Sequence, residues 1–385
     1  MHTRTGPPSR AATAPPRTAP IKVLHVLWNG ETGGAERAVY QLVREQMRDP
    51  GLDPSVGFAR PAGPYVDRLR ALGTPVVHLD LRRGADLPAV PRLGRAMRPY
   101  DLHHFHSAEP AMMLASSLCG DSRRVYTHRG GITDYDRRKR LQYGLTGVLL
   151  RRRFNALSGN TAHAARCAAE LFRIGGERIE VTYNGLEFEL LEARRTRAEA
   201  RASLGLRDTH FVVGTSAHLK SWKRIERLID AAAALALPHL RILVVGDGAD
   251  RSRLEARASA LGVSDRVLFV GMQQHISDFL IAMDAFSLPS MGLESFGNSA
   301  VEAMAVGLPT IVFADGGGLV EHIEDGRTGF VVNDQQELES ALARLAGDRQ
   351  LRASLGKAAS ADIRARYTLA ASGLAYRCLY AAALA

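Results

Sequence analysis

Short apolar runs alternate with segments of helical pattern along the first half of the chain. Residues 21–28 form the first apolar run, and shorter runs follow at residues 55–59, 75–79, 102–105, 124–127 and 154–157. Helical patterns lie between them, notably at residues 35–47, 110–118 and 161–172. Strands that alternate with helices of this length predict βαβ units, and nearly continuous apolar strands predict a parallel sheet buried on both faces.

The same alternation starts again after a polar stretch rich in Arg, Glu and Ala at residues 187–208. Apolar runs at residues 211–214, 240–245, 267–270, 285–288, 309–313 and 329–332 flank helical patterns at residues 224–236, 252–261 and 298–306. Two halves of about 170 residues fit the size of doubly wound domains, which bind ligands outside the carboxyl ends of their strands. The sequence therefore predicts an α/β protein of two Rossmann-like, doubly wound domains that face each other across a cleft.

The expected boundaries divide the chain into four segments. Residues 1–20 are rich in Pro, Ala, Thr and Arg and cannot bury a core, so we expect a disordered tail. The two domains should span residues 21–200 and 201–367. Residues 368–385 should form a C-terminal helix that packs back on the N-terminal domain.

Composition excludes several classes of protein. Hydrophobic residues make up 46% and charged residues 23%, as in an ordinary globular chain with a large core. No run approaches the roughly 18–20 apolar residues of a membrane-spanning helix, and the basic, proline-rich start does not resemble a signal peptide. Three widely separated cysteines encode neither a disulfide framework nor a zinc site. These features favour a cytoplasmic protein.

The chain is basic, and its positive charge is unevenly spread. Lys and Arg number 50 against 40 Asp and Glu, which gives a net charge of +10 and a surface that should attract anions. Basic residues concentrate between Arg123 and Arg153. A helix over residues 137–153 would place Leu145 and Val148 on one face with arginines around it. Such a helix suits either a peripheral contact with an anionic membrane or ordinary packing on its own sheet.

Two motifs carry candidate chemistry. The first follows the first strand and opens a helix, and it reads Asn29-Gly30-Glu31-Thr32-Gly33-Gly34-Ala35-Glu36-Arg37. Its glycines Gly33 and Gly34 let the backbone approach a phosphate or a sugar at a helix N-terminus. The spacing is not Gly-x-Gly-x-x-Gly, so the dinucleotide fingerprint is absent. Taken alone, the motif also fits a tight strand-to-helix turn.

The second motif, residues 289–309, surrounds another helix start. Glu294 lies in the loop after a strand, and Glu302 lies one turn inside the helix that begins near Asn298. Gly297 and Asn298 would present backbone N–H groups to an anion. A glutamate on a helix is usually solvated, but the neighbours of Glu302 are apolar, which indicates an inward-facing carboxylate.

This constellation resembles the retaining glycosyltransferases of family 4, which have the GT-B fold and use nucleotide sugars. Their signature Glu-x7-Glu matches the spacing of Glu294 and Glu302. The resemblance covers nearly all of residues 21–370 and continues at residues 184–185, 245–248, 317–321 and 325–332.

The resemblance implies a role for each matching residue of the C-terminal half, which would bind the nucleotide sugar. Glu302 would hold the nucleotide ribose, and Glu294 would contact hydroxyls of the donor sugar. Lys223 matches the lysine that neutralises the donor diphosphate. His218 departs from the pattern, because relatives usually have an arginine five residues before that lysine. We expect His218 to contact the diphosphate in its place.

The N-terminal half would recognise the acceptor. By the same resemblance, Gly33 and Gly34 approach the donor, and His106 lies in the cleft near the reacting sugar. Together, His106, Lys223 and Glu294 form the expected catalytic set. A packed histidine at a strand end is the alternative for His106.

The implied reaction is a retaining transfer in which the leaving diphosphate helps to remove the acceptor proton. A UDP-sugar is the expected donor, with N-acetylglucosamine or glucose favoured. The acceptor would be a lipid-linked glycan, at the inner face of the cell membrane, or a small metabolite. No metal or other cofactor is expected. The Asp-x-Asp at Asp134 and Asp136 lies far from the donor motifs and reads as a loop leading into a helix.

Other functions remain as alternatives at this level. A GT-B relative that hydrolyses or epimerises a nucleotide sugar would share the motifs. A nicotinamide-dependent oxidoreductase lacks its glycine fingerprint here. The net charge alone would suit a nucleic-acid-binding protein, but the basic residues lack interleaved aromatics and a binding motif, so no nucleic-acid partner is expected.

Overall fold

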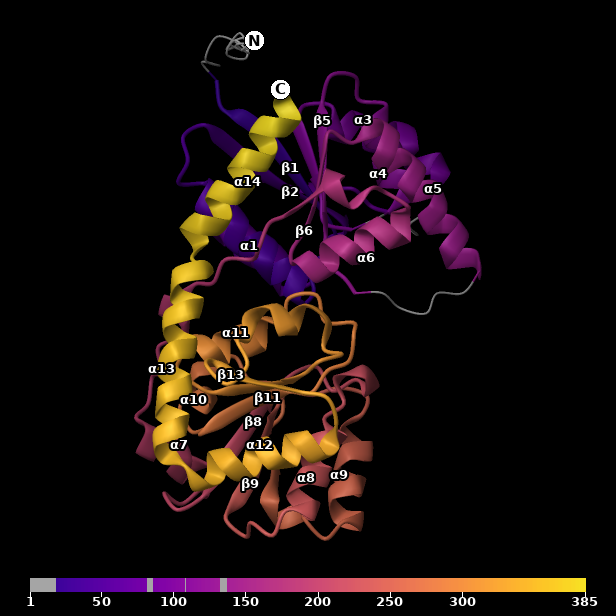
Figure 1. The fold of residues 1–385 in the computed structure, drawn as a ribbon. Helices are drawn as coiled ribbons and strands as arrows, with labels where there is room; N and C mark the ends of the chain where they lie inside the picture. The colour runs from indigo at the N-terminus through magenta and orange to yellow at the C-terminus, as the bar shows by residue number, and fades with distance from the viewer. Residues whose placement is uncertain (1–18, 82–85, 108, 132–136) are drawn as a thin grey trace, which may run out of the picture.

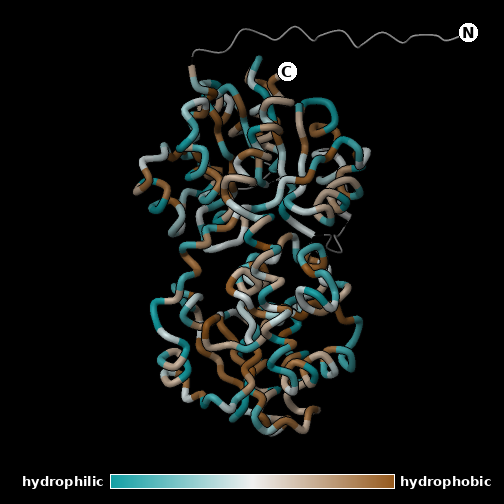
Figure 2. Tube along the Cα trace, turned by 60° about the vertical axis from the view of Figure 1, so that its left-hand side comes forward, coloured by the Kyte–Doolittle hydropathy of each residue, from teal (hydrophilic) through white to brown (hydrophobic). Residues whose placement is uncertain are grey.

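Two parallel β-sheets organise the chain, one in each of two domains stacked end to end (Figure 1). The structure is a computed structural model that describes residues 19–81, 86–107, 109–131 and 137–385. All but the last two residues of the tail expected over residues 1–20 lie outside the described residues. The Asp-x-Asp at Asp134 and Asp136 also lies outside them. Helices cover both faces of each sheet, and Figure 2 shows hydrophobic segments gathered inside the domains.

The N-terminal sheet has the strand order β3-β2-β1-β4-β5-β6-β7, and all its pairings are parallel. Its strands are β1 (Ile21–Asn29), β2 (Leu52–Arg60), β3 (Val76–His78), β4 (Leu102–Phe105), β5 (Arg123–His128), β6 (Ala156–Gly159) and β7 (Ile179–Val181). Its main helices are α1 (Gly34–Gln46), α2 (Pro64–Ala71), α3 (Val90–Met97), α4 (Pro110–Ser117), α5 (Arg137–Arg153) and α6 (Ala162–Phe172). The order reverses between β1 and β4, and a crevice for ligands forms at such a switch point.

The C-terminal sheet repeats this plan with the order β10-β9-β8-β11-β12-β13. Its strands are β8 (Phe211–Ser216), β9 (Leu240–Val245), β10 (Val267–Phe269), β11 (Ala285–Leu288), β12 (Thr310–Phe313) and β13 (Gly329–Val332). The helices in this half of the chain are α7 (Arg197–Ser203), α8 (Glu226–Ala234), α9 (Arg251–Ala260), α10 (Ser277–Leu280), α11 (Asn298–Ala305), α12 (Gln335–Gly347), α13 (Arg349–Arg366) and α14 (Leu369–Leu384). The expected fold class, two Rossmann-like domains, is confirmed.

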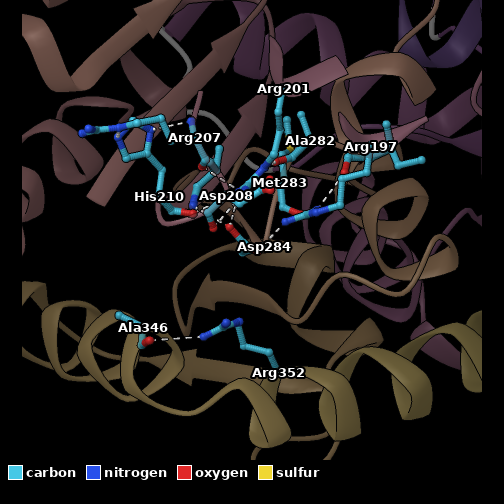
Figure 3. Close-up of polar contacts among 12 residues, drawn as sticks. Arg197, Arg201, Arg207, Asp208, His210, Ala282, Met283, Asp284, Ala346 and Arg352 are labelled. Atoms are coloured by element: carbon cyan, nitrogen blue, oxygen red, sulfur yellow. Dashed lines mark hydrogen bonds and ion pairs between the residues drawn. The ribbon is translucent and has the colours of Figure 1, made fainter. Parts of the chain in front are cut away.

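The linker helix α7 packs on the C-terminal domain. Arg201 is 3% exposed and donates to Asp284 Oδ2 at 2.7 Å, and Arg197 donates to the carbonyl oxygen of Met283 at 2.6 Å (Figure 3). These bonds anchor α7 to the turn before β11. The structure therefore places the start of the second domain before α7, a few residues earlier than the boundary predicted at residue 201.

The C-terminal helix crosses back to the N-terminal domain. In Figure 1, α13 runs along the lower domain and α14 continues upward beside α1. Tyr376, Leu379 and Tyr380 of α14 are almost fully buried in one cluster with Val23 and Val125 of the N-terminal sheet. The last helix is thus part of the N-terminal core.

The basic helix α5 packs against α6, and one of its arginines has a structural task. Arg151 donates to the carbonyl oxygens of Phe172 at 2.6 Å and Arg173 at 2.9 Å, which caps the C-terminus of α6. Arg152 and Arg153 are exposed. Among the described residues, no helix is long and apolar enough to cross a bilayer. A membrane contact through residues 137–153 stays a prediction.

Removing the Tyr380 hydroxyl should destabilise the N-terminal domain. This hydroxyl contacts His104 Nδ1 at 2.7 Å and accepts from Gln46 Nε2 at 3.1 Å, so Tyr380→Phe leaves two buried polar groups unpaired. We expect the free energy of unfolding in urea to fall by about 1–3 kcal/mol. Tyr40→Phe, at a half-buried tyrosine on α1, is the matched control. An unchanged free energy for Tyr380→Phe would show that the hydroxyl contributes nothing.

Candidate active site

The start of α11 lies at the carboxyl edge of the C-terminal sheet and faces the N-terminal domain. Gly297 adopts φ +74°, and a Cβ there would lie 2.1 Å from the Leu319 side chain, so only glycine fits. The turn lets α11 begin at Asn298 with its first N–H groups free of intrahelical partners. The helix end therefore offers donors and a positive dipole to an anion.

Glu302, one turn inside α11, is buried and bound across the domain boundary. It is 3% exposed, and Arg37 Nη1 on α1 lies 2.5 Å from its Oε1. Burial raises the pKa of Glu302, and the Arg37 guanidinium opposes that rise. Glu302, the residue expected to bind the ribose, thus faces inward, as its apolar neighbours predicted. Arg37, which belongs to the glycine motif, holds its carboxylate.

Lys223 and Glu294 also form a pair. Lys223 Nζ lies 2.6 Å from Glu294 Oε2, and both side chains are about one-tenth exposed. The Lys223 ammonium also lies 4.2 Å from the centre of the Trp222 ring. The structure therefore brings together the residues expected at the diphosphate and at the donor sugar. Each candidate carboxylate is paired with a cation.

The glycine motif closes the other side of the site. His218 Nε2 lies 3.2 Å from the carbonyl oxygen of Thr32, which links the two domains. Gly33 precedes α1, and a Cβ there would overlap the Glu36 carboxylate. A Cβ on Gly34 would lie 3.3 Å from Asn298 Nδ2, so Gly34 stands opposite the start of α11. Six of the predicted donor residues thus surround one place between the domains: Gly33, Gly34, His218, Gly297, Asn298 and Glu302.

His106 lies in the same cleft, but both of its ring nitrogens are bound to protein groups. Nδ1 accepts from Arg129 Nε at 3.0 Å, and Nε2 lies 3.0 Å from His25 Nδ1. Burial, together with the neighbouring His104 and Arg129, holds the pKa of His106 well below its usual value. In this state His106 has no nitrogen left for a sugar hydroxyl, so the structure assigns it a place in a packed network.

His25, His104 and His106 form the one group of possible metal ligands found among the described residues. Their arrangement does not fit an open metal site, because every ring nitrogen has a partner. His25 Nε2 bonds Gln46 at 2.7 Å, and the two nitrogens of His104 bond Tyr380 and Thr127, each at 2.7 Å. The Arg129 guanidinium beside the cluster would also repel a cation.

Four residues of the site had no role in the sequence prediction. Arg37, Arg129 and Asn184 lie between the domains at the start of α11. Glu321 reaches across from the C-terminal domain and accepts from the backbone N–H of His163 at 2.5 Å, at the N-terminus of α6. Arg37, Asn184 and Glu321 lie within the sequence motifs at residues 29–37, 184–185 and 317–321, but only the fold shows their partners.

A hollow of about 430 Å³ lies away from this site, between α7, α10 and α13. Two of the three arginines that line it, Arg197 and Arg352, donate to main-chain carbonyls of the same domain (Figure 3). Those bonds are structural, and the candidate active site is the cleft at the start of α11.

Comparison with known proteins identifies the family and the fold class. The model of glycosyl transferases group 1 matches residues 196–362, and the model of glycosyltransferase family 4 matches residues 32–190. A 2-deoxystreptamine N-acetyl-D-glucosaminyltransferase of Streptomyces fradiae is 31% identical over 74% of this chain and 72% of its own length. A D-inositol 3-phosphate glycosyltransferase of Stackebrandtia nassauensis is 33% identical over 56% of this chain, and the match spans only about half (51%) of that relative. The crystal structure of Anabaena Alr3699/HepE in complex with UDP superposes with a TM-score of 0.82 at 23% identity, over 94% of this chain and 100% of that one.

Fold, site and matches together define a glycosyltransferase of the GT-B class. The chain belongs to glycosyltransferase family 4.

Replacing Arg37 should destabilise the protein in a pH-dependent way. In Arg37→Met, Glu302 keeps its burial without its cation, so its pKa in the folded state rises further above the unfolded value. The folded state then holds a proton that the unfolded state has lost, and stability falls as pH rises through this window. We expect a loss of about 3 kcal/mol near neutral pH, for a buried carboxylate left unpaired, and a small loss near pH ~4.5.

Urea unfolding at both pH values measures this loss. Arg48→Met is the control, since Arg48 lies in the turn after α1, is 62% exposed and pairs with Glu45 near the end of that helix. Equal losses of Arg37→Met at both pH values would contradict the role of Glu302.

Proposed function

We propose that the protein transfers N-acetylglucosamine, or alternatively glucose, from a UDP-sugar to a hydroxyl group of a small cyclitol acceptor, with retention of configuration. The observation that carries the proposal is that Lys223, Glu294 and Glu302 lie together beside the start of α11 and the glycine motif. This arrangement offers a carboxylate for a ribose diol and positive charge for a diphosphate.

The charges fit the chemistry of sugar transfer. Breaking the bond between sugar and phosphate builds negative charge on the departing diphosphate. Lys223 would stabilise that charge, together with the free N–H groups at the start of α11. To do so, Lys223 would exchange part of its contact with Glu294 for the diphosphate, which would free Glu294 for the donor sugar.

The names of the relatives support the donor and the acceptor class. A relative aligned over most of both chains is named for the transfer of N-acetylglucosamine to 2-deoxystreptamine, and another is named for D-inositol 3-phosphate. Both named acceptors are polyhydroxylated carbocycles. A lipid-linked acceptor is the alternative, and the structural use of Arg151 weakens the case for a membrane contact through α5.

The retaining course and the independence from metal ions rest on the family resemblance. No separate cation site is needed if Lys223, the α11 dipole and the diphosphate itself manage the charge and the proton. Hydrolysis or epimerisation of the nucleotide sugar is the remaining alternative, and it would need no acceptor.

A direct assay tests the proposed function. The purified protein is incubated with UDP-N-acetylglucosamine or UDP-glucose, with and without 2-deoxystreptamine or inositol 3-phosphate, in the presence of a chelator. We expect UDP release that depends on the acceptor, an α-linked product and loss of activity in Glu302→Ala. UDP or free sugar formed equally without an acceptor would contradict transfer, and dependence on added metal would contradict the proposed mechanism.

A further inference from the structure

Arg129 is a cation at the centre of the cleft that the proposed function does not use. It follows β5 at the carboxyl edge of the N-terminal sheet and donates three hydrogen bonds: to His106 Nδ1 at 3.0 Å, Asn184 Oδ1 at 2.6 Å and the Tyr376 hydroxyl at 2.9 Å. Within the described part of the chain, no carboxylate forms an ion pair with Arg129. Its partners come from the residue after β4, from the loop after β7 and from α14.

A guanidinium can only donate hydrogen bonds, and this fixes the orientation of two asparagines. Asn184 must turn its Oδ1 to Arg129, so its Nδ2 donates to Asn298 Oδ1 at 3.3 Å. With its oxygen engaged, Asn298 turns Nδ2 toward the glycine motif, where that atom lies 3.3 Å from the position of a Cβ on Gly34. The amide at the start of α11 thus presents a donor to the cleft.

The same restriction orders the histidine network behind Arg129. His106 must accept at Nδ1, so it carries its proton on Nε2 and donates to His25 Nδ1. His25 then donates to Gln46, Gln46 donates to the Tyr380 hydroxyl, and that hydroxyl donates to His104. All of these hydrogen bonds point away from Arg129, and the groups that form them are neutral. Tyr376 of α14 accepts from the opposite side of the guanidinium.

We propose that Arg129 is a positioning residue for the donor diphosphate. Through Asn184 it sets the side chain of Asn298 so that N–H groups, rather than a carbonyl oxygen, face the anion at the start of α11. This inference rests on the proposed function, because it takes that place as the diphosphate site. It also makes α14 a support of the active site, since Tyr376 holds the far side of the guanidinium.

Asn184→Asp separates this role from a structural one. The new carboxylate still accepts from Arg129 and adds an ion pair, so the contact between the end of β5 and the loop after β7 is kept. The carboxylate has no N–H to donate to Asn298 Oδ1. Asn298 must therefore turn its Nδ2 toward the new carboxylate and its Oδ1 into the cleft. We expect the affinity for UDP, measured by calorimetry, to fall about tenfold or more, which corresponds to one charge-assisted hydrogen bond.

Three comparisons complete the experiment. Asn155→Asp is the matched control, because Asn155 Oδ1 accepts from the Arg124 backbone at 3.0 Å beside the start of β6, and a carboxylate keeps that bond. Uridine, which lacks the diphosphate, should bind the wild type and Asn184→Asp about equally. Arg129→Lys, which keeps a charged donor, should retain more UDP affinity than Arg129→Met.

The outcomes are distinct. Loss of UDP affinity in Asn184→Asp, with an unchanged or raised melting temperature and unchanged uridine binding, is the expected result. Unchanged UDP affinity in a folded Asn184→Asp variant, or equal losses for UDP and uridine, would overturn the positioning role while leaving the proposed function intact. Failure of the wild type to bind UDP or any other nucleoside diphosphate would overturn the proposed function and this inference with it.

Discussion

The contact between Arg37 and Glu302 joins the two domains at the place where the candidate chemistry lies. A buried carboxylate is costly unless a cation or hydrogen bonds compensate it, and here the cation comes from the other domain. The cleft is therefore built from both halves, and neither sheet alone holds a complete site. Lys223 and Glu294 repeat the principle within the C-terminal domain. A diphosphate would place another anion beside Lys223, and a ribose diol would donate hydrogen bonds to the Glu302 carboxylate.

Behind the cleft, the protein keeps a positive charge next to three histidines by holding the histidines neutral. Burial lowers the pKa of His25 to about 4 and that of His106 well below its usual value, and Arg129 adds to both shifts. Because Arg129 can only donate, each neighbour has one allowed orientation. The order thus reaches from Tyr380 on the last helix to Asn298 on α11, although these residues lie on different domains.

Much of this arrangement could be predicted from the sequence, for identifiable reasons. The apolar runs gave the strands because parallel strands are buried on both faces, and Gly297 marked a turn that only glycine can adopt. The inward direction of Glu302 followed from its apolar neighbours. The partners Arg37 and Arg129 could not be predicted, because Arg37 meets Glu302 only across the domain boundary and Arg129 contacts residues from three separate elements. His106 was expected near the reacting sugar, but it lies in a packed network, and its bonds to His25 and Arg129 depend on packing that no local pattern encodes.

The central claim is that one donor site is formed by both domains, and hydrogen exchange with and without UDP tests it most directly. The account predicts slower amide exchange in two separate segments when UDP binds, residues 30–37 of the glycine motif and residues 290–302 around the start of α11. Slower exchange in the C-terminal segment alone, with no change in residues 30–37, would contradict a site shared by the two domains.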